Sequence, residues 1–140
     1  MAGMKRFVTY IYSYEDRKKG NNVGFAKVDI RGEECRVEIH LRGIYPGRCT
    51  CKVFLIREED GSIIGVPVGE FKIMNGNGDF FIAVGAGQIG ESPFGIQEME
   101  GVLVLGEDDR IFMSRWQEGS VSEIDRACFR EWQQEPETTI

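Results

Sequence analysis

The side chains best suited to chemistry in this sequence are four cysteines and a single histidine. Cys49 and Cys51 flank one residue, so in an extended segment both thiols point to one face and could hold a metal with further ligands. His40 alternates with charged residues, on the opposite strand face from Cys35. A nucleophilic thiol or hydroxyl needs an imidazole within reach, and this spacing supplies none. We therefore predict reduced, structural thiols, no metal site and no catalytic residues; a disulfide and a metal site remain the alternatives.

Two further motifs could carry chemistry. The run 85–90 fits Gly-x-Gly-x-x-Gly after a predicted strand, but Glu91-Ser-Pro93 follows where a phosphate-binding helix would have to begin. No cofactor is therefore predicted. Glu70 lies in the middle of an apolar segment and could act with a second carboxylate in glycoside hydrolysis, although an acidic residue on a solvated strand face explains it equally.

Tyr10, Tyr12 and Tyr14 are spaced two residues apart and so share one face of a strand. If this face points outward, the rings form an amphipathic platform that could stack on a sugar or anchor a protein; if it points inward, they belong to the core. The other candidate contact segment is 85–100, the longest irregular connection, which contains Gln88 and Phe94.

The elements that must position these residues are strands. Alternation of apolar and polar residues recurs between Lys5 and Trp116, punctuated by Gly-rich and Asp-Gly turns. The pattern predicts an all-β domain of eight or nine strands in meander-like hairpins, forming an antiparallel sandwich or barrel. Its central hairpin is predicted between Cys35 and Arg57, and another across the turn 75–78.

The hydrophobic period changes after Gly119. Ser120 with Glu123 matches a capping box, and apolar residues then recur at helical spacing up to Trp132. We therefore predict an antiparallel β domain over 1–119, one C-terminal amphipathic helix over 120–134, packed on that domain or on a partner, and a disordered tail over 135–140.

Composition limits the possible partners. The chain has 140 residues, which suits one domain, and a net charge of −6, which argues against general binding to nucleic acid phosphates. No apolar run approaches the roughly 18 residues of a membrane-spanning helix, and no secretory signal is recognisable. We expect a cytoplasmic protein without a membrane partner.

Four segments resemble the amino-terminal region of an uncharacterised family of proteins from clostridia and related Firmicutes. They are Tyr10-x-Tyr12-x-Tyr14, Asn22–Val28, Ile64–Glu70 and Asn75–Phe80. The resemblance covers residues 4–117 and implies that a separate carboxy-terminal domain follows in longer relatives. It implies no activity, since that family has none assigned.

The sequence favours a non-catalytic binding or protein-interaction module, with a protein or a carbohydrate as partner. A small carbohydrate-active or hydrolytic domain that uses acidic residues is one alternative. A structural or oligomerisation domain, in which the chain forms a homo-oligomer, is another. The candidate binding residues are Tyr10, Tyr12, Tyr14, Glu70, Gln88 and Phe94.

Overall fold

Within the residues that the structure describes, nine strands form one sheet. The computed structural model describes residues 5–15, 18–44, 47–116 and 129–132. Two 3₁₀ turns, η1 (Ile96–Glu98) and η2 (Glu107–Asp109), accompany the strands. In chain order the strands are β1 (Lys5–Glu15), β2 (Lys18–Arg31), β3 (Glu34–Leu41), β4 (Arg48–Glu59), β5 (Ser62–Met74), β6 (Gly78–Gly85), β7 (Gly101–Leu105), β8 (Ile111–Arg115) and β9 (Phe129–Glu131).

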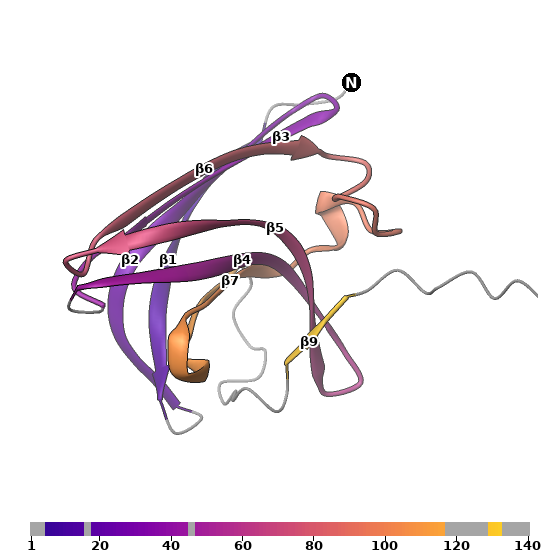
Figure 1. The fold of residues 1–140 in the computed structure, drawn as a ribbon. Helices are drawn as coiled ribbons and strands as arrows, with labels where there is room; N and C mark the ends of the chain where they lie inside the picture. The colour runs from indigo at the N-terminus through magenta and orange to yellow at the C-terminus, as the bar shows by residue number, and fades with distance from the viewer. Residues whose placement is uncertain (1–4, 16–17, 45–46, 117–128, 133–140) are drawn as a thin grey trace, which may run out of the picture.

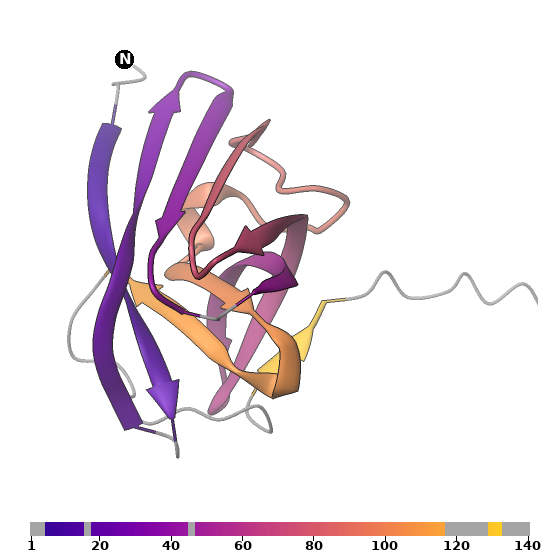
Figure 2. The ribbon, with the colours of Figure 1, turned by 60° about the vertical axis from the view of Figure 1, so that its left-hand side comes forward.

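The sheet is curled into a half-barrel. Its strand order is β6-β3-β2-β1-β8-β7-β4-β5-β9, and β1, β2, β3 and β6 arch over β4, β5 and β7 (Figure 1). The turned view shows the long β1 and β2 strands forming one wall (Figure 2). All pairings are antiparallel except β5 with β9, which is parallel. The all-β prediction is confirmed, with a mixed, curled sheet in place of a purely antiparallel one.

The predicted central hairpin is wrong. β3 pairs with β2 and β6, whereas β4 pairs with β5 and β7. The connection between β3 and β4 is instead attached to the β5–β6 turn, because the Ile44 N–H donates to the Gly76 carbonyl and the Asn75 N–H donates to the Gly47 carbonyl. The chain therefore passes from one wall of the half-barrel to the other at this point. The fold is not a simple meander.

The predicted hairpin across residues 75–78 forms only at its tip. Met74 and Asn77 make an isolated bridge, and β5 and β6 then separate along their length (Figure 1). Side chains fill the seam: the Phe80 ring lies 5.5 Å from the Phe71 ring and packs against Gly69, where an added Cβ would be 2.8 Å from the ring. Apolar packing joins the two edges here without a hydrogen-bond ladder.

Buried apolar residues form two clusters, one on each face of the sheet. The larger fills the inside of the half-barrel and includes Ile39, Leu55 and Phe112. The smaller lies on the outer face of β1, β8, β7, β4 and β5 and includes Phe54 and Leu103. Strand β4 is therefore buried on both faces from Val53 to Ile56, as its apolar run there predicts.

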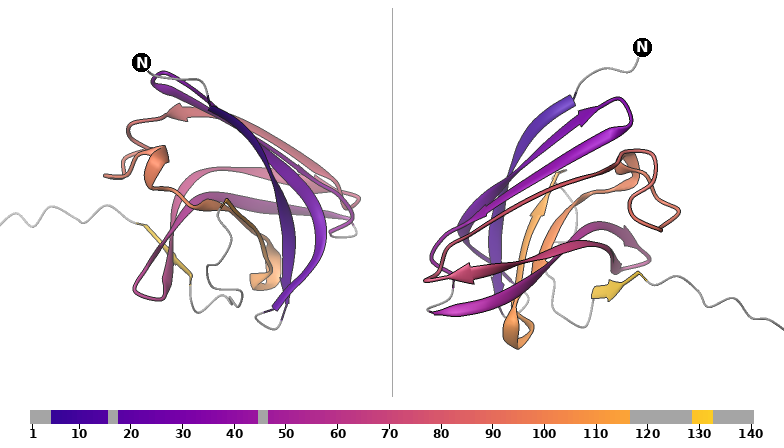
Figure 3. Two further views of the ribbon diagram at one scale, coloured as in Figure 1. Left: turned by 180° about the vertical axis from the view of Figure 1, so that it is seen from behind. Right: turned by 45° about the horizontal axis from the view of Figure 1, so that its top comes forward.

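The predicted C-terminal helix is not observed. Most of the range 120–134 lies outside the described residues, and the part within them, Phe129–Glu131, is strand β9. The Phe129 ring packs on Phe54 at 4.9 Å and fits where Gly65 leaves room for it, which fixes this segment at the edge of β5 (Figure 3). The predicted tail over 135–140 also lies outside the described residues. Among the residues that are described, no helix is long and apolar enough to cross a membrane.

Candidate binding face

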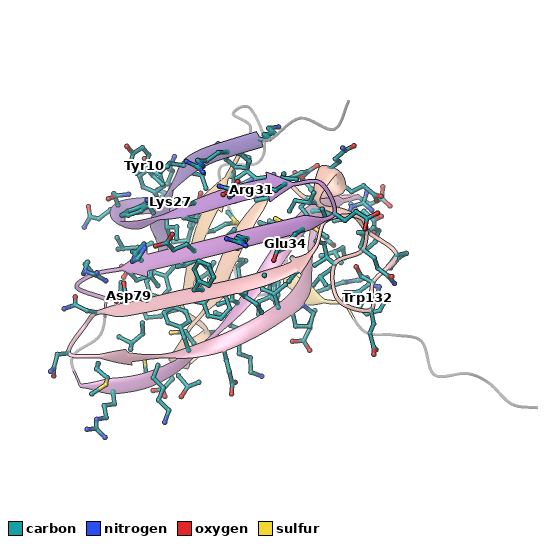
Figure 4. All side chains as sticks on the ribbon, turned by 90° about the horizontal axis from the view of Figure 1, so that it is seen from above. Tyr10, Lys27, Arg31, Glu34, Asp79 and Trp132 are labelled. Atoms are coloured by element: carbon teal, nitrogen blue, oxygen red, sulfur yellow. The ribbon has the colours of Figure 1, made fainter. Side chains whose placement is uncertain are left out.

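The outer face of the β1, β2, β3 and β6 wall carries residues aligned across four strands. Their pairing places them in three rows of four, which we call the ladder face. The first row is Tyr10, Phe25, His40 and Asp79; the second is Val8, Lys27, Glu38 and Phe81; the third is Arg6, Asp29, Arg36 and Ala83. Figure 4 looks onto this wall, and its labels for Tyr10, Lys27 and Asp79 mark three of the four strands.

Large apolar side chains are exposed on this face. Tyr10 is 60% exposed, Phe81 64% and Val8 50%. Phe25 lies between Tyr10 and His40 in the first row, with its ring 5.0 Å from the imidazole. Scattered exposed hydrophobic residues are ordinary, but here three of the four largest exposed apolar side chains of the described residues share one sheet face.

His40 is held between two carboxylates. Its Nδ1 lies 2.6 Å from Asp79 Oδ1 and its Nε2 lies 2.7 Å from Glu38 Oε1. Arg42 Nη2 donates to the same Asp79 oxygen at 3.1 Å. The hydrogen bond with His40, and next that with Arg42, hold the pKa of the Asp79 carboxyl below its usual value. Since both ring nitrogens are engaged, His40 is poorly placed to act as a general base.

The charges in the middle of the ladder face are only partly paired. Lys27 is exposed and lies opposite Glu38, yet it makes no ion pair with any residue in the described part of the chain. Glu38 contacts His40 instead. In the third row Asp29 contacts Arg6 at 3.5 Å, while Arg36 turns along its own strand to Glu34 at 3.4 Å. Lys27 and Glu38 lie directly opposite each other in the β2–β3 register, as do Asp29 and Arg36. Neither of these two pairs of cross-strand neighbours forms an ion pair.

A shallow depression of about 450 Å³ adjoins the third row. It lies where the β2–β3 turn meets the end of β6, close to the labels for Arg31 and Glu34 in Figure 4. Charged side chains of both signs line it, together with Ala83 and Val84. It extends the polar margin of the ladder face.

The three predicted tyrosines do not share one platform. Tyr10 is on the ladder face, Tyr12 is half-buried with the Lys19 ammonium 4.0 Å from its ring centre, and Tyr14 is buried in the outer apolar cluster. Register shifts on either side of Tyr12 and the pairing of β1 with β8 cause this difference, because the outer face is covered there.

The other predicted site residues lie away from the ladder face. Glu70 is exposed on β5 opposite Lys52, and Gln88 is exposed in the long loop. Phe94 is half-buried against the inner cluster, with the Arg57 guanidinium 4.4 Å from its ring. The structure brings none of them next to Tyr10.

Phe25, Lys27, His40 and Phe81 were not predicted as site residues. The alternation within β2 does place Phe25 and Lys27 on one strand face, and that within β3 places His40 on the charged face. Their proximity to Phe81 depends on the pairing of β3 with β6, which no turn signal indicates.

The three thiols within the described residues are buried. Cys35, Cys49 and Cys51 are free, and the Sγ atoms of Cys49 and Cys51 are 4.0 Å apart on the inner face, as their spacing predicts. Burial raises the pKa of Cys51 to about 12 and that of Cys35 to about 11, so both are protonated at neutral pH. Over the described residues, no group of three or more His, Cys, Asp or Glu side chains could hold a metal ion.

No protein-family model matches this sequence, and no curated protein and no solved structure gave a match. The nine-stranded half-barrel defines an all-β protein with an aromatic and charged outer face. Function has to be argued from that face.

Proposed function

We propose that this chain is a non-catalytic protein-interaction module whose contact surface is the ladder face. The observation that carries the proposal is the exposure of Val8, Tyr10 and Phe81 on one sheet face, interleaved with charged residues. Protein interfaces combine large aromatic anchors at the centre with polar and charged groups around them. The ladder face has this composition.

An enzymatic role has less support among the described residues. His40 has both nitrogens on carboxylates, and the thiols are buried and protonated. Glu70 lies directly opposite Lys52 in the β4–β5 pair, so its nearest cross-strand neighbour is a lysine and not a second carboxylate. The free, buried thiols also support a reducing compartment as the place of action.

A carbohydrate partner remains the second candidate, since the exposed Tyr10 ring could stack on a sugar. Such a site also needs free polar groups around the ring to bond hydroxyl groups. The other exposed side chains on this face include Val8 and Phe81, which are apolar and cannot bond hydroxyl groups. This favours a protein over a sugar.

Site-specific photocrosslinking tests the proposal. The photoreactive residue p-benzoylphenylalanine would replace Phe81 in the full chain, expressed in its native cells, and replace Met74 in a matched control. Met74 is 50% exposed, lies at the end of β5 and belongs to none of the three rows. We expect a discrete covalent protein adduct from position 81 and none from position 74. No adduct at position 81, or the same adduct from both positions, would overturn the proposal.

A further inference from the structure

We propose that the partner of the ladder face is a second copy of this chain. The two copies pack face to face about a two-fold axis that runs parallel to the strands, between β2 and β3. This inference rests on the proposed function, and it names the partner. It follows from the order of charges and apolar groups across the rows.

Such an axis keeps each row in place and exchanges the strands, so β2 faces β3 of the partner and β1 faces β6 of the partner. In the second row, Lys27 then meets the partner's Glu38, and Val8 meets the partner's Phe81. Every contact in this row joins opposite charges or two apolar side chains.

The other two rows bring no like charges together, and in the third row Arg6 meets the partner's Ala83. Asp29 meets the partner's Arg36 in the third row, and in the first row the Tyr10 hydroxyl can donate to the partner's Asp79. Phe25 meets the partner's His40, which repeats the ring contact that these two residues already make within one chain. The face is therefore complementary to itself.

The competing two-fold axis, perpendicular to the strands, gives the opposite result. It keeps each strand in place and exchanges the first row with the third, so Lys27 meets the partner's Lys27 and Glu38 meets the partner's Glu38. His40 would also meet the partner's Arg36. Like charges in contact are destabilising, so the charge pattern selects the axis parallel to the strands.

Lys27 and the two large apolar side chains are available for this packing, whereas Asp29 is already held by Arg6 at 3.5 Å and by Arg31 at 3.3 Å and would be shared with the partner's Arg36. Lys27 is exposed and has no ion-pair partner within the described ranges, and the Tyr10 and Phe81 side chains are largely exposed. The outer surface of the curled sheet is convex, so β2 and β3 come closest in this packing (Figures 1 and 2). Two sheets packed in this aligned way lie about 10 Å apart.

The size of the face sets the expected strength. Four strands spaced about 4.8 Å apart and three rows about 7 Å apart give a footprint of roughly 400 Å² per copy. Stable complexes bury about 800 Å² per partner. We therefore expect a weak dimer that forms as the protein concentration rises.

A charge-swap experiment tests the pairing of Lys27 with the partner's Glu38. The two-fold axis creates two such contacts in each dimer. A dimer of the Lys27→Glu variant would therefore have four carboxylates at these two contacts, and a dimer of the Glu38→Lys variant would have four ammonium groups there. Each variant should self-associate at least tenfold more weakly than the native chain. In an equimolar mixture, the carboxylate at position 27 of one chain meets the ammonium at position 38 of the other, and the second contact is native.

In the mixture, each variant chain carries two charges of the same sign at its own positions 27 and 38, whereas the native chain carries opposite charges there. Recovery of association on mixing therefore reports contact between chains and cannot come from repair within one chain. Sedimentation equilibrium at low salt measures it, with circular dichroism to establish folding. Lys52→Glu, an exposed change on β4, is the matched control and should leave self-association unchanged. A mixture that associates no better than its components would overturn the inference.

The failure of this inference is distinguishable from failure of the proposed function. A native chain that stays monomeric, while position 81 still crosslinks to a different protein, refutes the second copy and leaves the interaction module standing. A crosslinked adduct of twice the 15.9 kDa chain mass supports both. A monomeric chain without any adduct at position 81 refutes both.

Discussion

Gly24 offers the sharpest test of how the ladder face is built. It lies on β2 opposite Ile11 and Leu41, beside a register shift in β1, and its φ is +159°. A Cβ added there would be 1.8 Å from the His40 carbonyl oxygen. Gly24→Ala should therefore push β2 and β3 apart next to the imidazole.

The magnitude follows from the clash. The two strands have to separate by roughly 1 Å before the contact is tolerable, which costs about 1–3 kcal/mol as overpacking. The backbone conformation adds about 1–3 kcal/mol for a residue with a side chain. We expect Gly24→Ala to lower the free energy of unfolding by about 2–6 kcal/mol, a large part of the total stability of a domain of this size.

Gly32→Ala is the matched control. Gly32 has a φ of +58° in the β2–β3 turn, and nothing lies within 4 Å of an added Cβ, so this change carries the backbone cost without the clash. Urea denaturation of both variants measures the difference, and hydrogen exchange at residues 39–41 locates it. Equal unfolding midpoints for the two variants would refute the reasoning, because the close approach of Gly24 to His40 would then carry no cost.

Three further predictions concern the clusters that support the sheet. Burial raises the pKa of the Cys51 thiol to about 12, compared with about 8.5 in an unfolded chain. The protonated thiol therefore contributes its full stabilisation below about pH 8.5. This stabilisation is lost as the pH rises toward 12. Urea midpoints should fall less between pH 8 and 10 in Cys51→Ala than in the native chain, and identical slopes would contradict this. Phe112→Ala should lower the free energy of unfolding by about 3–5 kcal/mol, since the Phe112 ring is fully buried. Phe81→Ala should change the free energy of unfolding by less than about 0.5 kcal/mol, since the Phe81 ring is exposed. Similar urea midpoints for the two variants would show that the core assignment is wrong. Gly65→Val should displace Phe129, because a Cβ there would be 2.4 Å from its ring, and hydrogen exchange should then speed up in β9 alone; unchanged exchange in β9 would count against this packing.

The local pattern of the sequence predicts the strands well, because each strand is half-buried or fully buried and its side chains record that burial. The Asp-Gly pair at 60–61 and the glycine at 32 are examples of the turn signals in the sequence, and they do lie in the turns between β4 and β5 and between β2 and β3. What the pattern does not contain is the pairing of strands distant in the chain, such as β1 with β8 and β3 with β6. The central hairpin failed for this reason: alternation describes the face of a strand and says nothing about its neighbour.

The same limit applies to the site. Tyr10 was predicted as a candidate because its spacing is visible along one strand. Its relation to Phe25 needs the β1–β2 register, and the relation of His40 to Asp79 needs the pairing of β3 with β6. The β9 strand was missed because an apolar residue every three or four positions suits a helix, while the deciding contact is Phe129 against the bare backbone of Gly65.

The complementarity of the ladder face has a simple origin in the β2–β3 hairpin. Stable hairpins place opposite charges across the strand pair, as with Lys27 and Glu38, and a two-fold axis between those strands then brings the same two residues together from different chains. In most hairpins the cross-strand pair uses up these charges within the chain. Here Glu38 contacts His40 through one oxygen, Oε1, and the Lys27 ammonium has no ion pair among the described residues. The lysine and the second Glu38 oxygen are therefore both available for a contact between two chains.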